Sequence, residues 1–169
     1  KPPESIPKPR PAVADPTIKS AAHERQAEQA SAAYQRAVAE LKNDNLGVAY
    51  TSFEKLNQEY PLLAGPLTNM AIILRRQGEQ QKAYDLLNDA KAEHIGNPYF
   101  MNELGVISRQ LGKFDQAKES YETAIKIDFN YAKAHYNLGV LADLYLHDPN
   151  LALQEFEAYQ NLQPEPDNQ

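Results

Sequence analysis

The feature that most constrains the fold is a pattern that recurs along the chain every 34 residues. Its clearest copy spans residues 97–131, where two amphipathic helical patterns are joined by a short turn at Gly112. Small and large apolar residues stand at the same offsets 34 residues before and after this copy. A period of this length predicts stacked helix pairs, because a single pair cannot bury its own apolar face. We therefore expect an all-α solenoid.

Within this copy, the small, large and turn residues stand at characteristic spacings, and they are Leu104, Gly105, Gly112, Phe114, Ala117, Tyr121 and Ala124. In these residues the copy resembles the tetratricopeptide repeat (TPR) family. The resemblance implies a right-handed superhelical solenoid of antiparallel helix pairs over residues 30–165. Counting by 34 predicts repeats at 30–63, 64–97, 98–131 and 132–165, of which the first is degenerate and the fourth gains one residue near His147.

The local residue chemistry supports helix pairs. A small residue such as Gly105 lets two helices approach closely, and a large one such as Tyr121 fills the space between neighbouring pairs. Asn97 followed by Pro98, and Asp148 followed by Pro149, have the form of an N-cap with a first-turn proline. Two helices are thus expected to start at these dipeptides.

The chain ends differ in composition from the repeats. Residues 1–16 hold six of the twelve prolines, which predicts a disordered, proline-rich tether. It is either a passive linker or a ligand for a groove on another protein. Residues 17–29 predict a polar N-terminal helical extension, and residues 166–169 a disordered tail.

Charge and motif content exclude several functions. The formal net charge of the chain is −6, and residues 1–20 contribute +2, so the rest of the chain carries −8. Because so acidic a surface repels a phosphate backbone, nucleic acid is not expected as a partner. No run of about 18 apolar residues predicts a membrane span. Without cysteine, a phosphate loop or paired histidines, we expect neither enzymatic activity nor a metal or cofactor. His135 falls on a large aromatic position, where packing is the expected role.

The TPR resemblance implies a binding surface, the concave groove lined by the first helix of each pair. Its amide, aromatic and basic side chains suit a peptide segment of a partner protein, either acidic or ending in a free C-terminus. The inward-facing positions are Asn69, Ile72, Arg75 and Arg76 in the second repeat, Tyr99, Asn102, Val106 and Arg109 in the third, and Lys133, Tyr136, Asn137 and Val140 in the fourth. Asn69 and Asn137 have a structural alternative as scaffold residues, and Arg109 has one as the partner of a nearby acid.

Two functions follow. The first is a non-enzymatic adaptor that holds a peptide segment in the groove. The alternative is an assembly or homo-oligomerisation module, such as a homodimer, that acts through the solenoid ends. Its final face would carry Leu151, Leu153, Phe156, Tyr159 and Leu162.

The start of the chain leads to an expectation about location. A first residue of Lys1, the absence of cysteine and the proline-rich lead are typical of the mature part of an exported bacterial protein. We therefore expect a periplasmic protein or a lipoprotein, tethered to a membrane through a removed upstream segment. A trimmed cytosolic protein would have the same pattern.

Overall fold

The computed structural model describes the backbone of residues 16–163 and the side chains of residues 24–163. Except for Pro16, the predicted tether of residues 1–16 lies outside the described residues, as does the predicted tail of residues 166–169. The helices are α1 (Pro16–Lys42), α2 (Leu46–Glu59), α3 (Ala64–Arg76), α4 (Gln80–Asp89), α5 (Lys91–His94), α6 (Pro98–Gln110), α7 (Phe114–Ile127), α8 (Ala132–Leu141) and α9 (Pro149–Asn161), with a π-helical turn (Ala142–Leu146) after α8. Residues 16–163 contain no strand.

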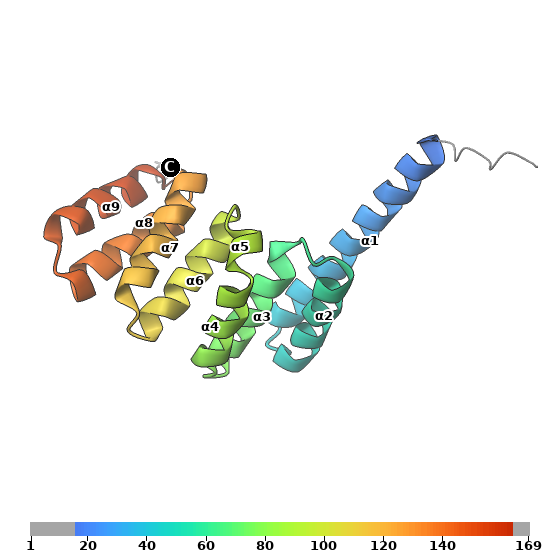
Figure 1. The fold of residues 1–169 in the computed structure, drawn as a ribbon, viewed down its shortest axis with the longest axis horizontal. Helices are drawn as coiled ribbons and strands as arrows, with labels where there is room; N and C mark the ends of the chain where they lie inside the picture. The colour runs from blue at the N-terminus through green and yellow to red at the C-terminus, as the bar shows by residue number, and fades with distance from the viewer. Residues whose placement is uncertain (1–15, 164–169) are drawn as a thin grey trace, which may run out of the picture.

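The helices pack as the antiparallel pairs α1–α2, α3–α4, α6–α7 and α8–α9, which stack in chain order (Figure 1). The result is a right-handed superhelical solenoid, as the TPR resemblance implies. The first pair is unequal, since α1 has 27 residues and α2 has 14. The N-terminal half of α1 therefore projects beyond the solenoid (Figure 1).

The turn inside each pair contains one residue with left-handed backbone. Gly78 (φ 82°) and Gly112 (φ 72°) serve the two inner pairs, and Asp44 (φ 62°) and His147 (φ 52°) serve the two outer ones. These four residues occupy the same place in the repeat. The inner turns therefore use glycine, which adopts the left-handed conformation without steric cost. The outer turns use residues with a Cβ, for which this conformation is strained.

The residue gained near His147 is accommodated in the π-helical turn Ala142–Leu146. A π turn spaces its hydrogen bonds one residue further apart than an α-helix does, so it absorbs one extra residue. Asp148 then caps α9 by accepting a hydrogen bond from Leu151 N at 3.1 Å. Asn97 caps α6 in the same way, accepting from Phe100 N at 3.0 Å. Both predicted N-caps are confirmed.

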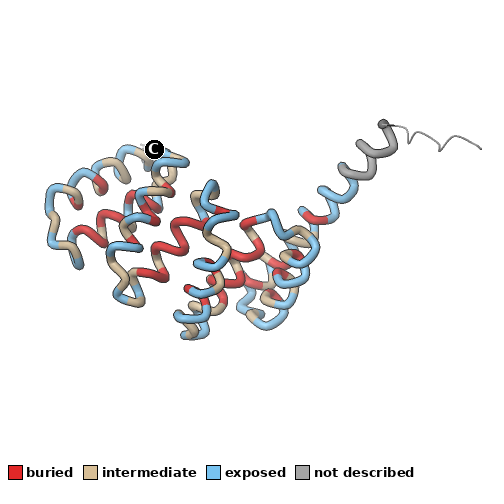
Figure 2. The backbone as a smooth tube through the Cα atoms, in the orientation of Figure 1, coloured by how far each residue is buried: buried red, intermediate tan, exposed pale blue. Residues whose placement is uncertain are grey.

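Buried residues line the sides of the helices that face one another (Figure 2). Gly105 of α6 lies tightly against α7, because a Cβ added to it would lie 2.5 Å from Tyr121 Cε1. A Cβ on Gly139 of α8 would lie 2.7 Å from Phe156 Cε1 of α9. The two glycines thus allow an aromatic ring of the second helix to lie against the backbone of the first, which confirms the packing role predicted for Gly105.

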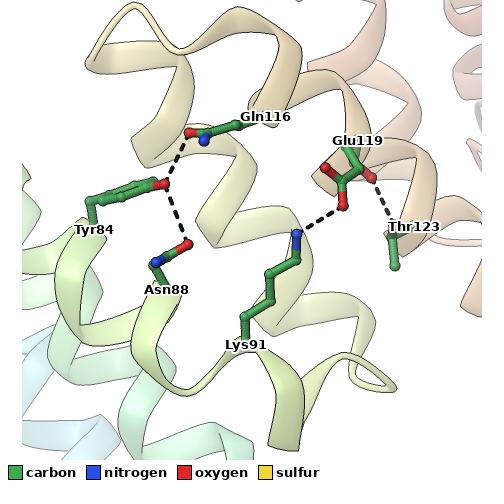
Figure 3. Close-up of polar contacts among 6 residues, drawn as sticks. All are labelled: Tyr84, Asn88, Lys91, Gln116, Glu119 and Thr123. Atoms are coloured by element: carbon green, nitrogen blue, oxygen red, sulfur yellow. Dashed lines mark hydrogen bonds and ion pairs between the residues drawn. The ribbon is translucent and has the colours of Figure 1, made fainter.

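Polar contacts join the second helices of neighbouring pairs (Figure 3). The Tyr84 hydroxyl of α4 donates to Gln116 Oε1 of α7 at 2.9 Å. At the start of α5, Lys91 Nζ lies 2.8 Å from Glu119 Oε1 of α7. Because Glu119 is mostly exposed, this ion pair contributes no more than about 1 kcal/mol to stability.

A buried polar contact joins α8 to α9. His135 Nδ1 lies 2.7 Å from Glu155 Oε2, and His135 Nε2 lies 2.9 Å from the backbone oxygen of Phe129. The histidine and glutamate side chains are only 2% and 7% exposed. His135 therefore packs inside the last pair, as its place in the repeat predicts, and it also makes a polar link that the pattern does not reveal.

Candidate binding groove

The first helices of the pairs border a groove of about 510 Å³ along α3, α6 and α8. We call it the first-helix groove. It brings together most of the side chains that the sequence predicts for the binding surface: Asn69, Ile72, Arg75, Arg76, Tyr99, Asn102, Val106, Lys133 and Asn137. Tyr34, Thr68, Asn97, Glu103 and Tyr131 are further side chains of the groove wall.

The amide side chains of the groove form hydrogen bonds between neighbouring repeats. Asn69 Nδ2 donates to Tyr34 Oη at 2.8 Å, and Asn137 Nδ2 donates to Asn102 Oδ1 at 2.9 Å. Each bond spans 35 residues, one more than the repeat, so the two bonds occupy corresponding places in their respective pairs of repeats. Asn69 Nδ2 also donates to the backbone oxygen of Gly65 at 2.9 Å, so these amides act in the scaffold.

One predicted cation of the groove is engaged by a carboxylate. Arg75 Nε lies 2.6 Å from Glu103 Oε1, with the two side chains 26% and 10% exposed. Glu103 is absent from the sequence-based set, although it stands 34 residues from both Asn69 and Asn137 and so shares their place in the repeat. Strict use of the 34-residue phase would have included it.

Two cations remain available to a ligand. Arg76 and Lys133 are both exposed side chains of the groove. Among residues 24–163, neither makes an ion pair or a side-chain hydrogen bond. Arg75 balances the charge of Glu103, so Arg76 and Lys133 give the groove a net positive charge.

Three tyrosines, Tyr34, Tyr99 and Tyr131, form the aromatic part of the groove. Tyr99 is 58% exposed, and its ring meets that of Tyr131 edge-on with centroids 4.8 Å apart. Burial raises the pKa of Tyr131 to about 12, and the nearby Tyr99, Glu103 and Asp128 act in the same direction. Tyr131 immediately precedes α8, just as Asn97 precedes α6, and this shared place is the signal by which it could have been found.

Three predicted residues lie outside the groove: Arg109, Tyr136 and Val140. The Arg109 guanidinium carbon lies 5.9 Å from the centroid of the Tyr145 ring. It also lies near Tyr121, where burial raises the tyrosine pKa to about 12 and the arginine charge partly opposes that rise. The Tyr136 ring packs 5.2 Å from that of Tyr159 in α9. Arg109 and Tyr136 thus contact the last repeat rather than the groove.

The described part of the chain offers little else for chemistry. Residues 24–163 contain no group of three or more histidine, aspartate or glutamate side chains placed to hold a metal ion. None of the helices described has the length and apolar character needed to cross a bilayer.

Comparison with known proteins identifies a TPR repeat. A family model described as "TPR repeat" matches residues 105–142. MamA from Desulfovibrio magneticus RS-1 is similar in structure, with a TM-score of 0.64, 19% sequence identity, and coverage of 79% of this chain and 75% of that chain. YrrB, a TPR protein with an unusual peptide-binding site, gives a TM-score of 0.63 at 20% identity, covering 80% of this chain and 70% of that chain. No curated protein matches the sequence.

Proposed function

Because the chain contains a TPR repeat and folds as a TPR solenoid, we propose that it is a non-enzymatic adaptor that binds a peptide segment of a partner protein in the first-helix groove. The observation that carries the proposal is a pair of exposed cations, Arg76 and Lys133, that have no partner among residues 24–163 and lie beside the exposed ring of Tyr99. A rigid aromatic ring supplies contact area, and the cations supply charge-assisted hydrogen bonds.

The charges of the groove favour an acidic ligand or one that ends in a free carboxylate. Arg75 contributes less than its charge implies, because Glu103 already pairs with it. Arg76 belongs to α3 and Lys133 to α8, so a ligand that contacts both must cross α6. An extended segment has the necessary length at about 3.3 Å per residue. That YrrB is a TPR protein with a peptide-binding site supports this use of the fold.

The proposal is tested by selecting peptides from a displayed random library on the immobilised chain and titrating the best of them calorimetrically. The informative variant is Arg76→Glu with Lys133→Glu. It is expected to weaken binding by about tenfold or more, since a charge-assisted hydrogen bond contributes about 1.5–3 kcal/mol. Amidating the C-terminus of the peptide distinguishes recognition of a free carboxylate from recognition of acidic side chains.

A matched control is Lys55→Glu with Lys126→Glu, which makes the same change in net charge on exposed residues of the second helices α2 and α7. This control should bind as the wild type does. The groove proposal is wrong if both double variants bind equally, or if the library yields no binder.

A second function is favoured by the exposed apolar residues of the last repeat. Leu144 and Leu153 are 59% and 60% exposed, and Tyr145 is 40% exposed. Of the residues predicted for this face, Leu151, Phe156, Tyr159 and Leu162 are half-buried. Self-association through the solenoid end would cover these groups. Light scattering over a range of concentrations tests it, because a chain that stays monomeric at high concentration lacks this activity.

A further inference from the structure

A second cavity, of about 640 Å³, lies between α1 and the turn that joins α2 to α3. In Figure 1 this place is where α1 leaves the solenoid and begins to project. The cavity adjoins the first-helix groove, because Tyr34, Gly65 and Asn97 line both. We call it the α1 cleft, and its main walls are Ala27, Ala30, Tyr34, Tyr60, Leu63 and Pro66.

The α1 cleft and the groove differ in chemistry. Among the residues that the structure describes, no lysine, arginine, aspartate or glutamate lines the cleft, whose walls are mainly apolar and aromatic. Leu63 stands in this wall and is 45% exposed. The groove instead presents the exposed cations Arg76 and Lys133. A ligand that fills both cavities therefore needs an apolar part and an acidic part.

Tyr34 forms the boundary between the two cavities and is held on three sides. Its hydroxyl accepts a hydrogen bond from Asn69 Nδ2 of the groove at 2.8 Å. Its ring meets that of Phe53 edge-on, with centroids 5.6 Å apart. Gly65 lies against the same ring, since an added Cβ would lie 3.0 Å from Tyr34 Cε2. The boundary is thus fixed before a ligand binds, which lowers the entropic cost of binding across it.

The repeat phase places the cleft in line with the groove. Ser31, Gly65, Tyr99 and Lys133 follow one another at intervals of 34 residues, so they hold the same place on the first helices of four successive pairs. Ser31 lines the α1 cleft, and Gly65 lines both cavities. Tyr99 and Lys133 line the groove. This row therefore leads from the apolar cavity to the cationic one, and at Gly65 no side chain stands in the way.

We propose that the peptide bound in the first-helix groove extends along this row into the α1 cleft. An apolar side chain of the peptide fills the cleft, its backbone crosses Gly65 and Tyr99, and its acidic side chains lie at Lys133 and Arg76. This inference rests on the proposed function and adds the class of peptide, which has an apolar anchor and an acidic segment.

The arrangement of the first helices sets the spacing between these two parts. Helices α3, α6 and α8 are neighbours in turn, and packed helix axes lie about 8–10 Å apart. Lys133 therefore lies about 16–20 Å from Gly65 along the row. An extended chain covers this distance in about five or six residues at about 3.3 Å each. We expect the acidic residue about five or six positions from the apolar one.

The test selects peptides from a displayed random library separately on the wild-type chain and on Leu63→Ser. Leu63 is the N-cap residue of α3, a position at which serine is favoured, so this variant removes an apolar wall and preserves the start of the helix. Peptides selected on the wild type should carry the apolar residue and the acid at the expected spacing. Peptides selected on Leu63→Ser should keep the acid and lose the preference for the apolar residue.

Calorimetric titration of the strongest wild-type-selected peptide gives the magnitude. Replacing its apolar residue by serine should weaken binding to the wild type about tenfold, the effect expected for burying one apolar side chain. The same replacement should have little effect on binding to Leu63→Ser. Leu62→Ser is the matched control, because Leu62 is 86% exposed and outside the cleft, and it should bind the peptide as the wild type does.

Arg76→Glu with Lys133→Glu separates this inference from the proposed function. If the charge reversal weakens binding while Leu63→Ser binds the peptide as the wild type does, groove binding stands and the extension into the α1 cleft is overturned. The extension is also overturned if the serine replacement weakens binding equally to the wild type and to Leu63→Ser, because the apolar residue then lies elsewhere. If the charge reversal leaves binding unchanged, the proposed function fails and this inference fails with it.

Discussion

Replacing Gly105 by alanine is expected to destabilise the solenoid. The new Cβ would lie 2.5 Å from Tyr121 Cε1 and 2.7 Å from Tyr121 Cδ1, whereas carbon atoms in contact normally lie about 3.5–4.0 Å apart. The ring cannot move freely, because Tyr121 is fully buried and packs with Leu138 and Leu141. Either the ring or helix α6 must therefore shift by about 1 Å.

Two terms of opposite sign set the magnitude. Overpacking a well-filled core costs about 1–3 kcal/mol. Replacing a glycine inside a helix by alanine contributes about 1 kcal/mol of stabilisation through helix propensity. We therefore expect Gly105→Ala to lower the free energy of unfolding by about 1 kcal/mol, and by no more than about 2 kcal/mol, measured as a shift of the urea midpoint at constant slope.

Two further variants make the test specific. Gly47→Ala, in α2, meets no atom within 4 Å and should be neutral or stabilising. The preceding repeat holds Ala71 and Leu87 where the third repeat holds Gly105 and Tyr121. Gly105→Ala should therefore stop being destabilising in a Tyr121→Leu background, and the double-mutant cycle should show coupling. The reasoning is refuted if Gly105→Ala lowers stability equally in both backgrounds, or not at all in the wild type.

Three other predictions concern stability. Glu103→Gln should lower the free energy of unfolding by about 1–2 kcal/mol, since it leaves Arg75 partly buried without its carboxylate, and the charge swap Arg75→Glu with Glu103→Arg should recover part of that loss in urea unfolding. His147→Gly should raise the melting temperature, because it relieves about 1 kcal/mol of left-handed strain, while Gly112→Ala should lower it. Burial raises the folded-state pKa of Tyr121 to about 12, so the protonated ring contributes its full stability below about pH 10, and this contribution is lost as the pH rises toward 12. At pH 11 the free energy of unfolding of the wild type should therefore have fallen by about 1 kcal/mol more than that of Tyr121→Phe, measured by urea unfolding at each pH.

Part of the candidate site follows from the TPR resemblance together with the repeat phase. Asn69, Asn137 and the cations Arg76 and Lys133 were placed on the groove because the first helix of each pair presents the same positions to it. Arg109 and Tyr136 were placed there by the same rule but turn toward Tyr145 and Tyr159 of the last repeat. The rule assumes that every repeat has the same neighbours, and the π-helical turn after α8 changes them for the third and fourth repeats.

The state of each charged group required the tertiary structure. Nothing in the local pattern shows that Arg75 is matched by Glu103 across 28 residues while the adjacent Arg76 is not. An ion pair depends on distances of a few ångströms between side chains of different repeats, which the residue spacing does not fix. The α1 cleft, of about 640 Å³, likewise lies where the long helix α1 meets the turn that joins α2 to α3, so its walls come from three separate segments.

What the sequence by itself determined is the solenoid. Helix pairing follows from the 34-residue period, from the small residues that admit close packing and from the turn glycines, all of which are local properties repeated in phase. Only the tertiary structure decided which groove cations are neutralised, which predicted groove residues turn away, and where the second cavity opens. The physical reason is that helix formation and nearest-neighbour stacking depend on local periodicity, whereas ligand-facing chemistry depends on side-chain distances between repeats that are not identical.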